Sequence, residues 1–344
     1  MTLIERIDAL DILGKHLLIP SDTLEGIMRH TANKNAWFTI ENQRKAIDEI
    51  ATHFLSKEKL ENWVKNYEIE PPTKNHQPKT VGLVLAGNIP LVGFHDVLCV
   101  FISGNKTKIK ISDKDPYLLP YILQILKEID PRTADFFQIT EGFLKDFDAV
   151  IATGSNNSAR YFDAYFGKYP NIIRKNRNAV AILRGGETIE ELALLGEDVF
   201  TYFGLGCRNV SKIYLPRGYD FHPLLEAFHE YREAVLHDKY KNNFDYNFTL
   251  LILNKVKHEA NGCILMREST DIASPIAVLY YEYYDDLTDL KINLWQRRDE
   301  IQLIVANEKV EGLPTFSFGE AQKPSLSDYA DGIDTMAWLV NLSH

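Results

Sequence analysis

The order of apolar and polar positions predicts alternating strands and helices over most of the chain. After residue 78, short apolar runs suited to buried strands alternate with longer stretches at helical spacing. We expect strands at 81–86, 106–111, 137–139, 149–152, 179–183 and 211–215, and helices at 91–102, 118–129, 188–202 and 223–236. This alternation is typical of βαβ units, and it predicts an α/β fold with parallel-type sheets in two domains.

The first 70 residues have a different pattern and are expected to be helical. Thr39 offers a capping oxygen before apolar residues at helical spacing, and Ser56 opens another short helix. This segment contains no obvious reacting group, which favours a packing or oligomerisation layer. Three prolines between Glu70 and Pro78 then predict a linker.

Composition narrows the class of protein. The 344 residues are 45% hydrophobic and 25% charged, which excludes a disordered chain, and a net charge of −10 argues against a general nucleic-acid binder. Three cysteines suggest free thiols in a reducing compartment. The N-terminus has no clean apolar core of a signal peptide, and the apolar-leaning run 89–103 is too short for a bilayer. We expect a soluble, cytoplasmic protein.

Polar loops follow three of the predicted strands, at 87–90, 111–116 and 153–157. Ligands of parallel sheets bind beyond the carboxyl ends of strands, so these loops are candidates for a nucleotide site. Each loop alone is a weak signal, because polar caps after strands are common. The G-x-G-x-x-G fingerprint and the P-loop pattern are both absent from the sequence.

The cysteines and histidines carry the remaining candidate chemistry. Cys99 and Cys263 lie in apolar runs and are expected in the core, whereas Cys207 follows two glycines and precedes Arg208. These neighbours suit a nucleophile, although a structural thiol remains an alternative. His95, beside Asp96, fits either an acid/base pair or a satisfied buried histidine. No histidine or cysteine spacing supports a metal site.

Lysines alternate along 106–111, with Lys106, Lys108 and Lys110 on one face of the expected strand. The usual interpretation of such a face is a solvated edge of the sheet. The alternative is that one of these lysines holds a ribose or phosphate.

Two segments, AGNIPLVGFHD at 86–96 and YFGLGCRNVSK at 202–212, resemble the LuxC-type acyl-CoA reductases. These are fatty-acyl reductases of the aldehyde dehydrogenase superfamily. The resemblance covers about residues 80–344, is most specific around Cys207, and draws little on the N-terminal helices. It implies an aldehyde-dehydrogenase-like fold, with an N-terminal helical segment at 1–70 and a nicotinamide-dinucleotide-binding domain at 71–172. The implied fold continues with a catalytic domain at 173–320 and ends with a packing or oligomerisation segment at 321–344.

The resemblance also implies roles for single residues. Cys207 matches the thiol that attacks the acyl thioester, and Asn88 matches the amide of the oxyanion hole. His95 is the candidate for proton transfer. The implied cofactor-binding residues are Lys110 and Ser112 near the adenosine ribose, Thr153, Gly154 and Ser155 at the turn that approaches the dinucleotide, and Asp271 near the nicotinamide ribose.

Two departures from the superfamily pattern bear on the reaction. Ile173 stands where hydrolytic aldehyde dehydrogenases carry a glutamate base, which suits thioester reduction rather than hydrolysis. Asp113 stands where members of the superfamily that prefer NAD have a glutamate, and Lys114 lies beside it. The LuxC-type family uses NADPH, but a carboxylate at this position disfavours its 2′-phosphate, so NADH stays an alternative cofactor.

The expected function is therefore NAD(P)H-dependent reduction of a long-chain fatty acyl-CoA or acyl-protein thioester to the aldehyde, through an acyl-enzyme on Cys207. An acyl-donor protein and a homo-oligomer are the expected partners. The alternatives are a cysteine acyltransferase or thioesterase that needs no cofactor, and a non-catalytic protein on the same fold.

Overall fold

The computed structural model describes residues 1–69 and 77–342, which divide into two compact units. Unit 1 comprises residues 1–176 and 324–344, and unit 2 comprises residues 177–323. The linker expected at Glu70–Pro78 falls mostly on residues 70–76, which lie outside the described residues. Each unit is built on one sheet, so the predicted α/β class with two parallel-type sheets and preceding helices is confirmed.

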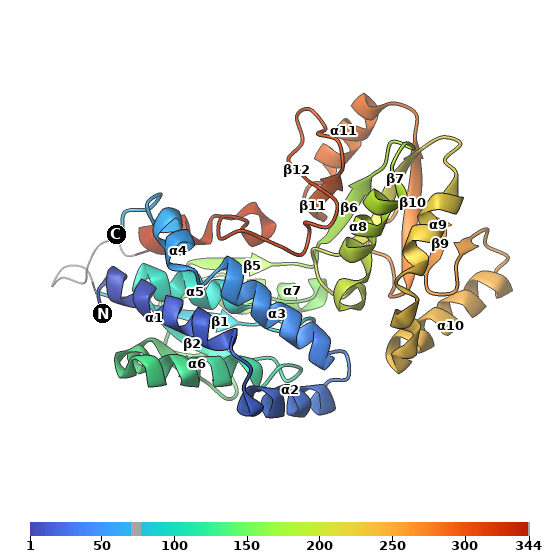
Figure 1. Ribbon diagram of the computed structural model, residues 1–344. Coiled ribbons are helices and arrows are strands. Elements are labelled where there is room, and N and C mark those ends of the chain that lie inside the picture. Colours follow the sequence, from blue (N-terminus) through green and yellow to red (C-terminus); the bar gives the residue numbers. More distant parts are fainter. Residues whose placement is uncertain (70–76, 343–344) are drawn as a thin grey trace. The chain divides into compact units, whose positions relative to one another are not determined.

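Unit 1 combines the N-terminal helices, the first sheet and the C-terminal segment (Figure 1). Its helices are α1 (Leu3–Leu17), α2 (Asp22–Lys34), α3 (Ile40–His53), α4 (Lys57–Val64), α5 (Phe94–Ser103), α6 (Leu118–Ile129), η1 (Pro131–Phe136), α7 (Asn156–Phe166), η4 (Ala330–Gly332) and α12 (Thr335–Asn341). Its strands are β1 (Thr80–Val84), β2 (Lys106–Lys110), β3 (Phe137–Ile139), β4 (Ala149–Thr153) and β5 (Asn171–Arg174).

The sheet of unit 1 is parallel throughout, with the strand order β3-β2-β1-β4-β5. The chain moves outward from β1 through α5 to β2, and then returns to the other side of β1 to continue through β4 and β5. Right-handed crossovers therefore place α5 and α6 on one face and α7 on the other. The reversal between β1 and β4 is the point of a doubly wound sheet where a ligand crevice is expected.

The N-terminal helices share the hydrophobic core of this sheet. Leu13 of α1, Ile47 of α3 and Leu60 of α4 are buried in the same cluster as Val81 and Leu83 of β1. Amphipathic helices reach stability by covering such a face, which explains why a segment without reacting groups folds against the sheet.

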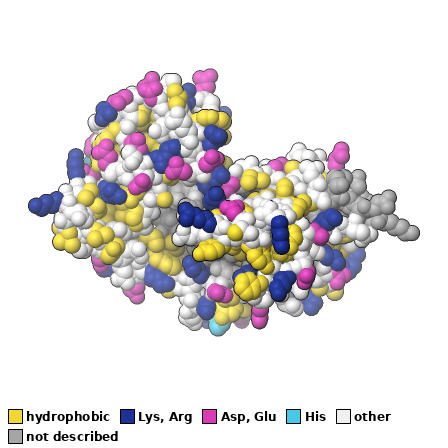
Figure 2. Space-filling model, turned by 180° about the vertical axis from the view of Figure 1, so that it is seen from behind, with side chains coloured by type: hydrophobic (Ala, Val, Ile, Leu, Met, Phe, Trp, Pro, Cys, Tyr) yellow, Lys and Arg dark blue, Asp and Glu magenta, His cyan; other side chains and the backbone are white. Residues whose placement is uncertain are grey.

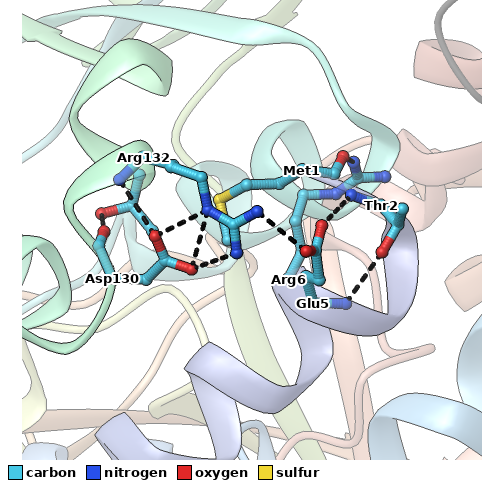
Figure 3. Close-up of polar contacts among 7 residues, drawn as sticks. Met1, Thr2, Glu5, Arg6, Asp130 and Arg132 are labelled. Atoms are coloured by element: carbon cyan, nitrogen blue, oxygen red, sulfur yellow. Dashed lines mark hydrogen bonds and ion pairs between the residues drawn. The ribbon is translucent and has the colours of Figure 1, made fainter.

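Polar contacts fix the start of α1 (Figure 3). The Thr2 hydroxyl accepts from the backbone N–H of Glu5, and the Glu5 carboxylate accepts from Thr2 N at 2.6 Å, which completes a capping box. These bonds, with Arg132 at 2.8 Å, lower the pKa of Glu5 to about 2. The buried Arg6 guanidinium donates to the carbonyl of Ile102 at 3.0 Å, so the end of α5 is tied to α1.

Unit 2 contains the second sheet and its covering helices (Figure 1). Its strands are β6 (Asn178–Ile182), β7 (Val210–Pro216), β8 (Glu259–Ala260), β9 (Leu265–Glu268), β10 (Val278–Tyr284), β11 (Ile301–Ala306) and β12 (Thr315–Phe316). Its helices are α8 (Ile189–Phe200), η2 (Thr201–Gly204), α9 (Phe221–His229), η3 (Arg232–Leu236), α10 (Asp238–Leu253) and α11 (Leu287–Gln296).

The sheet of unit 2 has the strand order β12-β11-β6-β7-β10-β9-β8, and its pairs are parallel except β8 with β9. Helix α11 covers one face, where Leu290 and Leu294 pack against Val180 and Ile182 of β6. Helix α8 lies between β6 and β7 in the chain and ends beside the turn that precedes β7.

The two crossings between the units lie near the expected domain borders. The chain leaves unit 1 after Asn176 and returns to it at Pro324, against expected borders at 172/173 and 320/321. Residues 1–69 and 324–342 belong to unit 1, where α12 contacts α5. The division into four segments stays a prediction.

Within the described residues, no helix combines the length and hydrophobicity that a membrane crossing requires. Figure 2 shows basic and acidic side chains interspersed over one face of the protein, in keeping with the modest net charge.

Candidate active site

Three loops of unit 1 meet at the carboxyl edge of its sheet. They follow the neighbouring strands β2, β1 and β4, and they carry Ser112, Asn88 and the turn Thr153–Ser155. A Cβ on Gly87 would lie 2.3 Å from the Ser112 hydroxyl, so the first two loops approach so closely that only glycine fits there. The structure thus brings the candidate residues of these loops to one edge, together with Lys110 at the end of β2, whereas His95 lies in α5.

Asp115, which the sequence analysis missed, ties two of these loops together. Its Oδ2 accepts from the backbone N–H of Leu91 at 3.0 Å, and Leu91 has a positive φ of 55° in the loop that carries Asn88. Burial raises the pKa of Asp115 to about 6. Its Oδ1 is buried without a hydrogen-bond partner among the described residues, beside a cavity of about 10 Å³ that Ser112 also lines. No local pattern distinguishes this aspartate from Asp113.

The Thr153–Ser155 turn leads into the N-terminus of α7. The Ser155 hydroxyl accepts from the backbone N–H of Ser158 at 3.2 Å, and a Cβ on Gly154 would lie 2.8 Å from the Phe162 ring. Free N–H groups at a helix start suit phosphate. The lysine face of β2 also follows the prediction, since Thr107 and Ile109 are buried while the lysines are not. Lys110 lies over the Phe143 ring at 5.9 Å.

His95 and Asp96 are not paired with each other in unit 1. His95 is partly buried, its Nε2 lies 3.1 Å from the carbonyl oxygen of Leu326, and its ring packs on Phe54, Trp63 and Tyr329. Burial lowers its pKa. These contacts fit the alternative of a satisfied histidine, and proton transfer by His95 stays a prediction.

Asp96 instead forms a buried ion pair across unit 1. Its Oδ2 lies 2.5 Å from Nη1 of Arg174, at the end of β5, and Nη2 of Arg174 donates to the Thr335 hydroxyl at 2.9 Å. The position of the hydrolytic base, Ile173, packs as an apolar side chain against the cluster of Leu144 and Phe147.

Cys207 of unit 2 lies in an unusual turn between α8 and β7. Tyr202, Phe203 and Gly204 have consecutive positive φ values of 54°, 58° and 74°. Such conformations cost roughly 1–3 kcal/mol each for non-glycine residues and cluster at functional sites. Cys207 is partly exposed, whereas Cys99 and Cys263 are buried, which confirms the expectation that these two belong to the core.

The loop that carries Asp271 reaches the same edge of the unit 2 sheet as Cys207. Ser211, at the start of β7, donates its hydroxyl to the carbonyl of Ile272 at 2.7 Å. Nζ of the buried Lys212 donates to the carbonyl of Thr270 at 3.0 Å. Asp271 itself is exposed between these two anchored residues.

Sequence analysis also missed Asn209, whose side chain is fully buried two residues after Cys207 and hydrogen-bonded on both of its ends. Among residues 1–69 and 77–342, no three histidine, cysteine, aspartate or glutamate side chains gather as a metal site.

Residues 34–174 match the family model described as acyl-CoA reductase (LuxC). The match starts at the last residue of α2, so α3 and α4 carry part of the resemblance, against the expectation, whereas α1 and nearly all of α2 lie outside it. Helices α3 and α4 share their core with β1. The Cys207 segment lies outside the matched residues.

The likeness to solved structures extends over both sheets. Indole-3-acetaldehyde dehydrogenase in complex with NAD+ is 14% identical, with a TM-score of 0.66 over 91% of this chain and 78% of that chain. An acetylating aldehyde dehydrogenase from Geobacillus thermoglucosidasius is 11% identical, with a TM-score of 0.65 over 95% of this chain and 86% of that chain. The chain has the aldehyde dehydrogenase fold. The predicted fold class is therefore confirmed.

One curated relative agrees with the family match. The long-chain acyl-protein thioester reductase of Aliivibrio fischeri is 23% identical over 155 residues, which cover 40% of this chain. The alignment spans about a third (32%) of the length of that relative. The resemblance to LuxC-type acyl reductases on an aldehyde dehydrogenase fold is thereby confirmed.

Proposed function

We propose that this protein reduces a fatty acyl thioester to the aldehyde with a nicotinamide cofactor, through an acyl-enzyme on Cys207. The observation that carries the proposal is a partly exposed thiol at a strained turn of an aldehyde dehydrogenase fold. The LuxC match to residues 34–174 and the acyl-protein thioester reductase relative support an acyl substrate.

In the proposed first step, the Cys207 thiolate attacks the thioester carbonyl and a new C–S bond forms. The carbonyl oxygen becomes an oxyanion, which the Asn88 amide and backbone N–H groups stabilise by roughly 2.7–4 kcal/mol per donor. Collapse of the intermediate expels the substrate thiolate and leaves the acyl group on Cys207. After reduction, the hemithioacetal loses its proton, its C–S bond breaks, and the aldehyde leaves.

The residues of unit 1 fit a nicotinamide dinucleotide. The strand order reverses at β1, Gly87 allows a close approach, and α7 offers its N-terminal N–H groups. We assign Lys110 and Ser112 to the adenosine ribose, Thr153, Gly154 and Ser155 to the dinucleotide, and Asp271 of unit 2 to the nicotinamide ribose. When bound, the reduced cofactor supplies the hydride that converts the acyl group to the aldehyde level.

Ile173 favours reduction over hydrolysis. Its side chain packs in an apolar cluster, and it cannot accept a proton from water. An acyl-enzyme without that base would persist long enough to be reduced.

The substrate we propose is a long-chain acyl-CoA or acyl-protein thioester, with NADPH as the first candidate cofactor and NADH as the second. Asp113 and Lys114 are both exposed in the loop after β2. A carboxylate there repels a 2′-phosphate and a lysine attracts it, so the cofactor preference depends on this pair. An acyl-donor protein and a second copy of the chain are the proposed partners.

The test is cofactor oxidation, followed by the ultraviolet absorbance of reduced nicotinamide, with long-chain acyl-CoA and either NADPH or NADH. We expect thioester-dependent oxidation that is absent in Cys207→Ala, and aldehyde in equal amount to the cofactor oxidised. Release of free CoA without oxidation, dependent on Cys207, would contradict the reductase and favour the acyltransferase or thioesterase. A purified acylated donor protein, offered in place of acyl-CoA, decides which thioester is the better substrate.

A further inference from the structure

Asn209 uses its whole side chain to organise the turn around Cys207. Its Nδ2 donates to the carbonyl oxygens of Asp198 at 3.0 Å and Thr201 at 2.8 Å. Its Oδ1 accepts from the backbone N–H of Gly206 at 2.8 Å. Only 1% of Asn209 is exposed, so water cannot take over these bonds.

The three partners of Asn209 explain why its amide matters. The carbonyls of Asp198 and Thr201 stand at the end of α8, where a helix leaves its last carbonyls without internal partners. The strained residues Tyr202 and Phe203 follow directly, and Gly206 is the neighbour of Cys207. One side chain therefore connects the helix end to the residue before the thiol, across the strained segment.

Asp198 holds the other side of the same turn. Its two carboxylate oxygens accept from the backbone N–H groups of Gly319 at 2.8 Å and Ala321 at 2.9 Å. The Arg208 guanidinium donates in turn to the carbonyl of Ala321. Both neighbours of Cys207 are thus anchored to α8, Gly206 through Asn209, and Arg208 through segment 319–321 and Asp198.

We infer that Asn209 is a positioning residue for the Cys207 thiol, and that Asp198 supports the same turn through segment 319–321. The inference rests on the proposed function in one respect, namely that Cys207 is the nucleophile. A nucleophile must lie within a few tenths of an ångström of its attack position, and a displacement of about 1 Å costs roughly 10²-fold in rate. The bonds from Asn209 reach the residue before the thiol, and those from Asp198 reach the segment that holds Arg208.

A matched control exists in the same unit. The Asn261 side chain donates to the carbonyl of Leu225 at 2.8 Å and accepts from the backbone N–H groups of Cys263 and Ile264 at 3.1 Å. Asn261 therefore makes the same kinds of bonds beside a buried cysteine. Asn261→Ala reports the cost of losing them away from the Cys207 turn.

The experiment compares Asn209→Ala, Asp198→Asn and Asn261→Ala in the full chain. For Asn209→Ala we expect kcat to fall about 10²-fold with little change in KM. Asp198→Asn removes one acceptor for segment 319–321, and we expect a loss of about tenfold. Asn261→Ala should lower Tm about as much as Asn209→Ala does, but it should keep the kcat of the unchanged protein.

A second readout does not depend on thioester reduction. Alkylation of Cys207 by iodoacetamide, followed by peptide mass spectrometry, measures the access and motion of this thiol alone. Loss of the Asn209 bonds should raise its rate about tenfold, because the turn opens more often, while Asn261→Ala should leave it unchanged.

The two readouts separate the possible failures. If the unchanged protein reduces no thioester, the proposed function fails, yet faster alkylation in Asn209→Ala would still support the positioning role. If Asn209→Ala and Asp198→Asn match Asn261→Ala in both kcat and alkylation, the positioning role is overturned. Should Asn209→Ala not fold, Asp198→Asn alone decides by the same comparison.

Discussion

The two units of this protein carry different kinds of information about it. Unit 1 contains the residues that match the LuxC family, whereas unit 2 contains Cys207 and lies outside that match. The likeness in fold covers both, at 91% of the chain. The resemblance to the family and the candidate nucleophile thus rest on separate parts of the chain, and each can be tested without the other.

Individual buried polar side chains of the two candidate regions differ in how fully they are hydrogen-bonded. In unit 1, Asp115, Asp96 and Arg174 each keep one buried polar atom without a partner among the described residues. In unit 2, both carboxylate oxygens of Asp198 are paired, and Asn209 is bonded at both ends. Tyr214 and Asn293 of unit 2 also keep a buried polar atom without a partner among the described residues, so the contrast concerns these particular side chains and not the units as a whole.

The largest expected effect separates Cys207 of unit 2 from Cys99 of unit 1. Cys207→Ala should lower kcat by at least about 10³-fold, because the nucleophile is removed. Cys99→Ala, in the core of α5, should keep kcat and lower Tm slightly, because it removes only a small buried group. Thioester-dependent cofactor oxidation and thermal unfolding of both variants provide the measurement.

Equal losses of activity in the two cysteine variants would contradict this contrast. It would mean that the thiol of Cys207 acts through packing, as that of Cys99 does, and the non-catalytic alternative would gain support.

The second effect concerns stability within unit 1. Asp96→Ala leaves the Arg174 guanidinium buried without its counterion, and we expect a loss of roughly 3–5 kcal/mol in the free energy of unfolding. Replacing both residues by Leu should recover much of this loss. Hydrogen exchange resolved by peptide should show weaker protection in β1, β4 and β5, with β7 and β10 of unit 2 unchanged.

Uniform loss of protection in both sheets would contradict independent stability of the units. The double variant is the control, because it removes the same bonds without leaving a buried charge.

Several strands of the two sheets could be predicted from the sequence, but the strand that carries the partner of Asp96 could not. Strands β1, β4, β6 and β7 were predictable from apolar runs bounded by polar or glycine-rich loops, and β2 from the alternation of lysines with Thr107 and Ile109. Strand β5 was not, because it has four residues and ends on Arg174, a residue that normally marks a surface. Its guanidinium is buried through Asp96, 78 residues earlier, and no local pattern reveals such a partner.

The third effect tests the proposed role of Asn88 as an oxyanion donor. Asn88→Ala should lower kcat by about 10²–10³-fold, since one preorganised donor is lost. KM for acyl-CoA should change little, because the donor acts on the charge that develops in the transition state. Steady-state kinetics give both constants.

Alkylation of Cys207 distinguishes the proposed role of Asn88 from that of Asn209. Asn88→Ala should leave alkylation of Cys207 by iodoacetamide unchanged, whereas Asn209→Ala should raise it. If Asn88→Ala raises it equally, Asn88 acts on the thiol itself rather than on the oxyanion.

Only some residues of the candidate site could be proposed from the sequence. Cys207, Asn88 and the loops after β1, β2 and β4 could be proposed from the sequence because their residue types and order resemble motifs of a known family, and their roles stay predictions. Asn209 and Asp115 were missed because their value lies in backbone groups that become neighbours only in the fold, such as the N–H of Leu91 for Asp115. An asparagine in a glycine-rich turn and an aspartate after a strand are both common, so sequence alone gives them no distinct signal.

The smallest effect compares the two buried aspartates that organise the loops. Burial raises the pKa of Asp198 to about 7 and that of Asp115 to about 6, against an ordinary value of 3.8. Between 3.8 and the folded pKa, the folded state binds more protons than the unfolded state, so stability falls as pH rises. The stability that Asp115 contributes through its raised pKa is lost by about pH 6, whereas that of Asp198 is lost by about pH 7.

Above the pKa of Asp115, most of the remaining pH dependence from this pair comes from Asp198. Between the two pKa values, the unchanged protein and Asp115→Asn should each lose about 1 kcal/mol of stability through Asp198, which is half ionised at the upper end, and Asp198→Asn should not. Denaturant unfolding at several pH values measures the difference, and the histidines, common to all three proteins, cancel in it. An identical slope in Asp198→Asn would mean that Asp198 is already ionised there. Its two backbone N–H bonds would then outweigh the burial, and the Cys207 turn would be held by a charged carboxylate throughout.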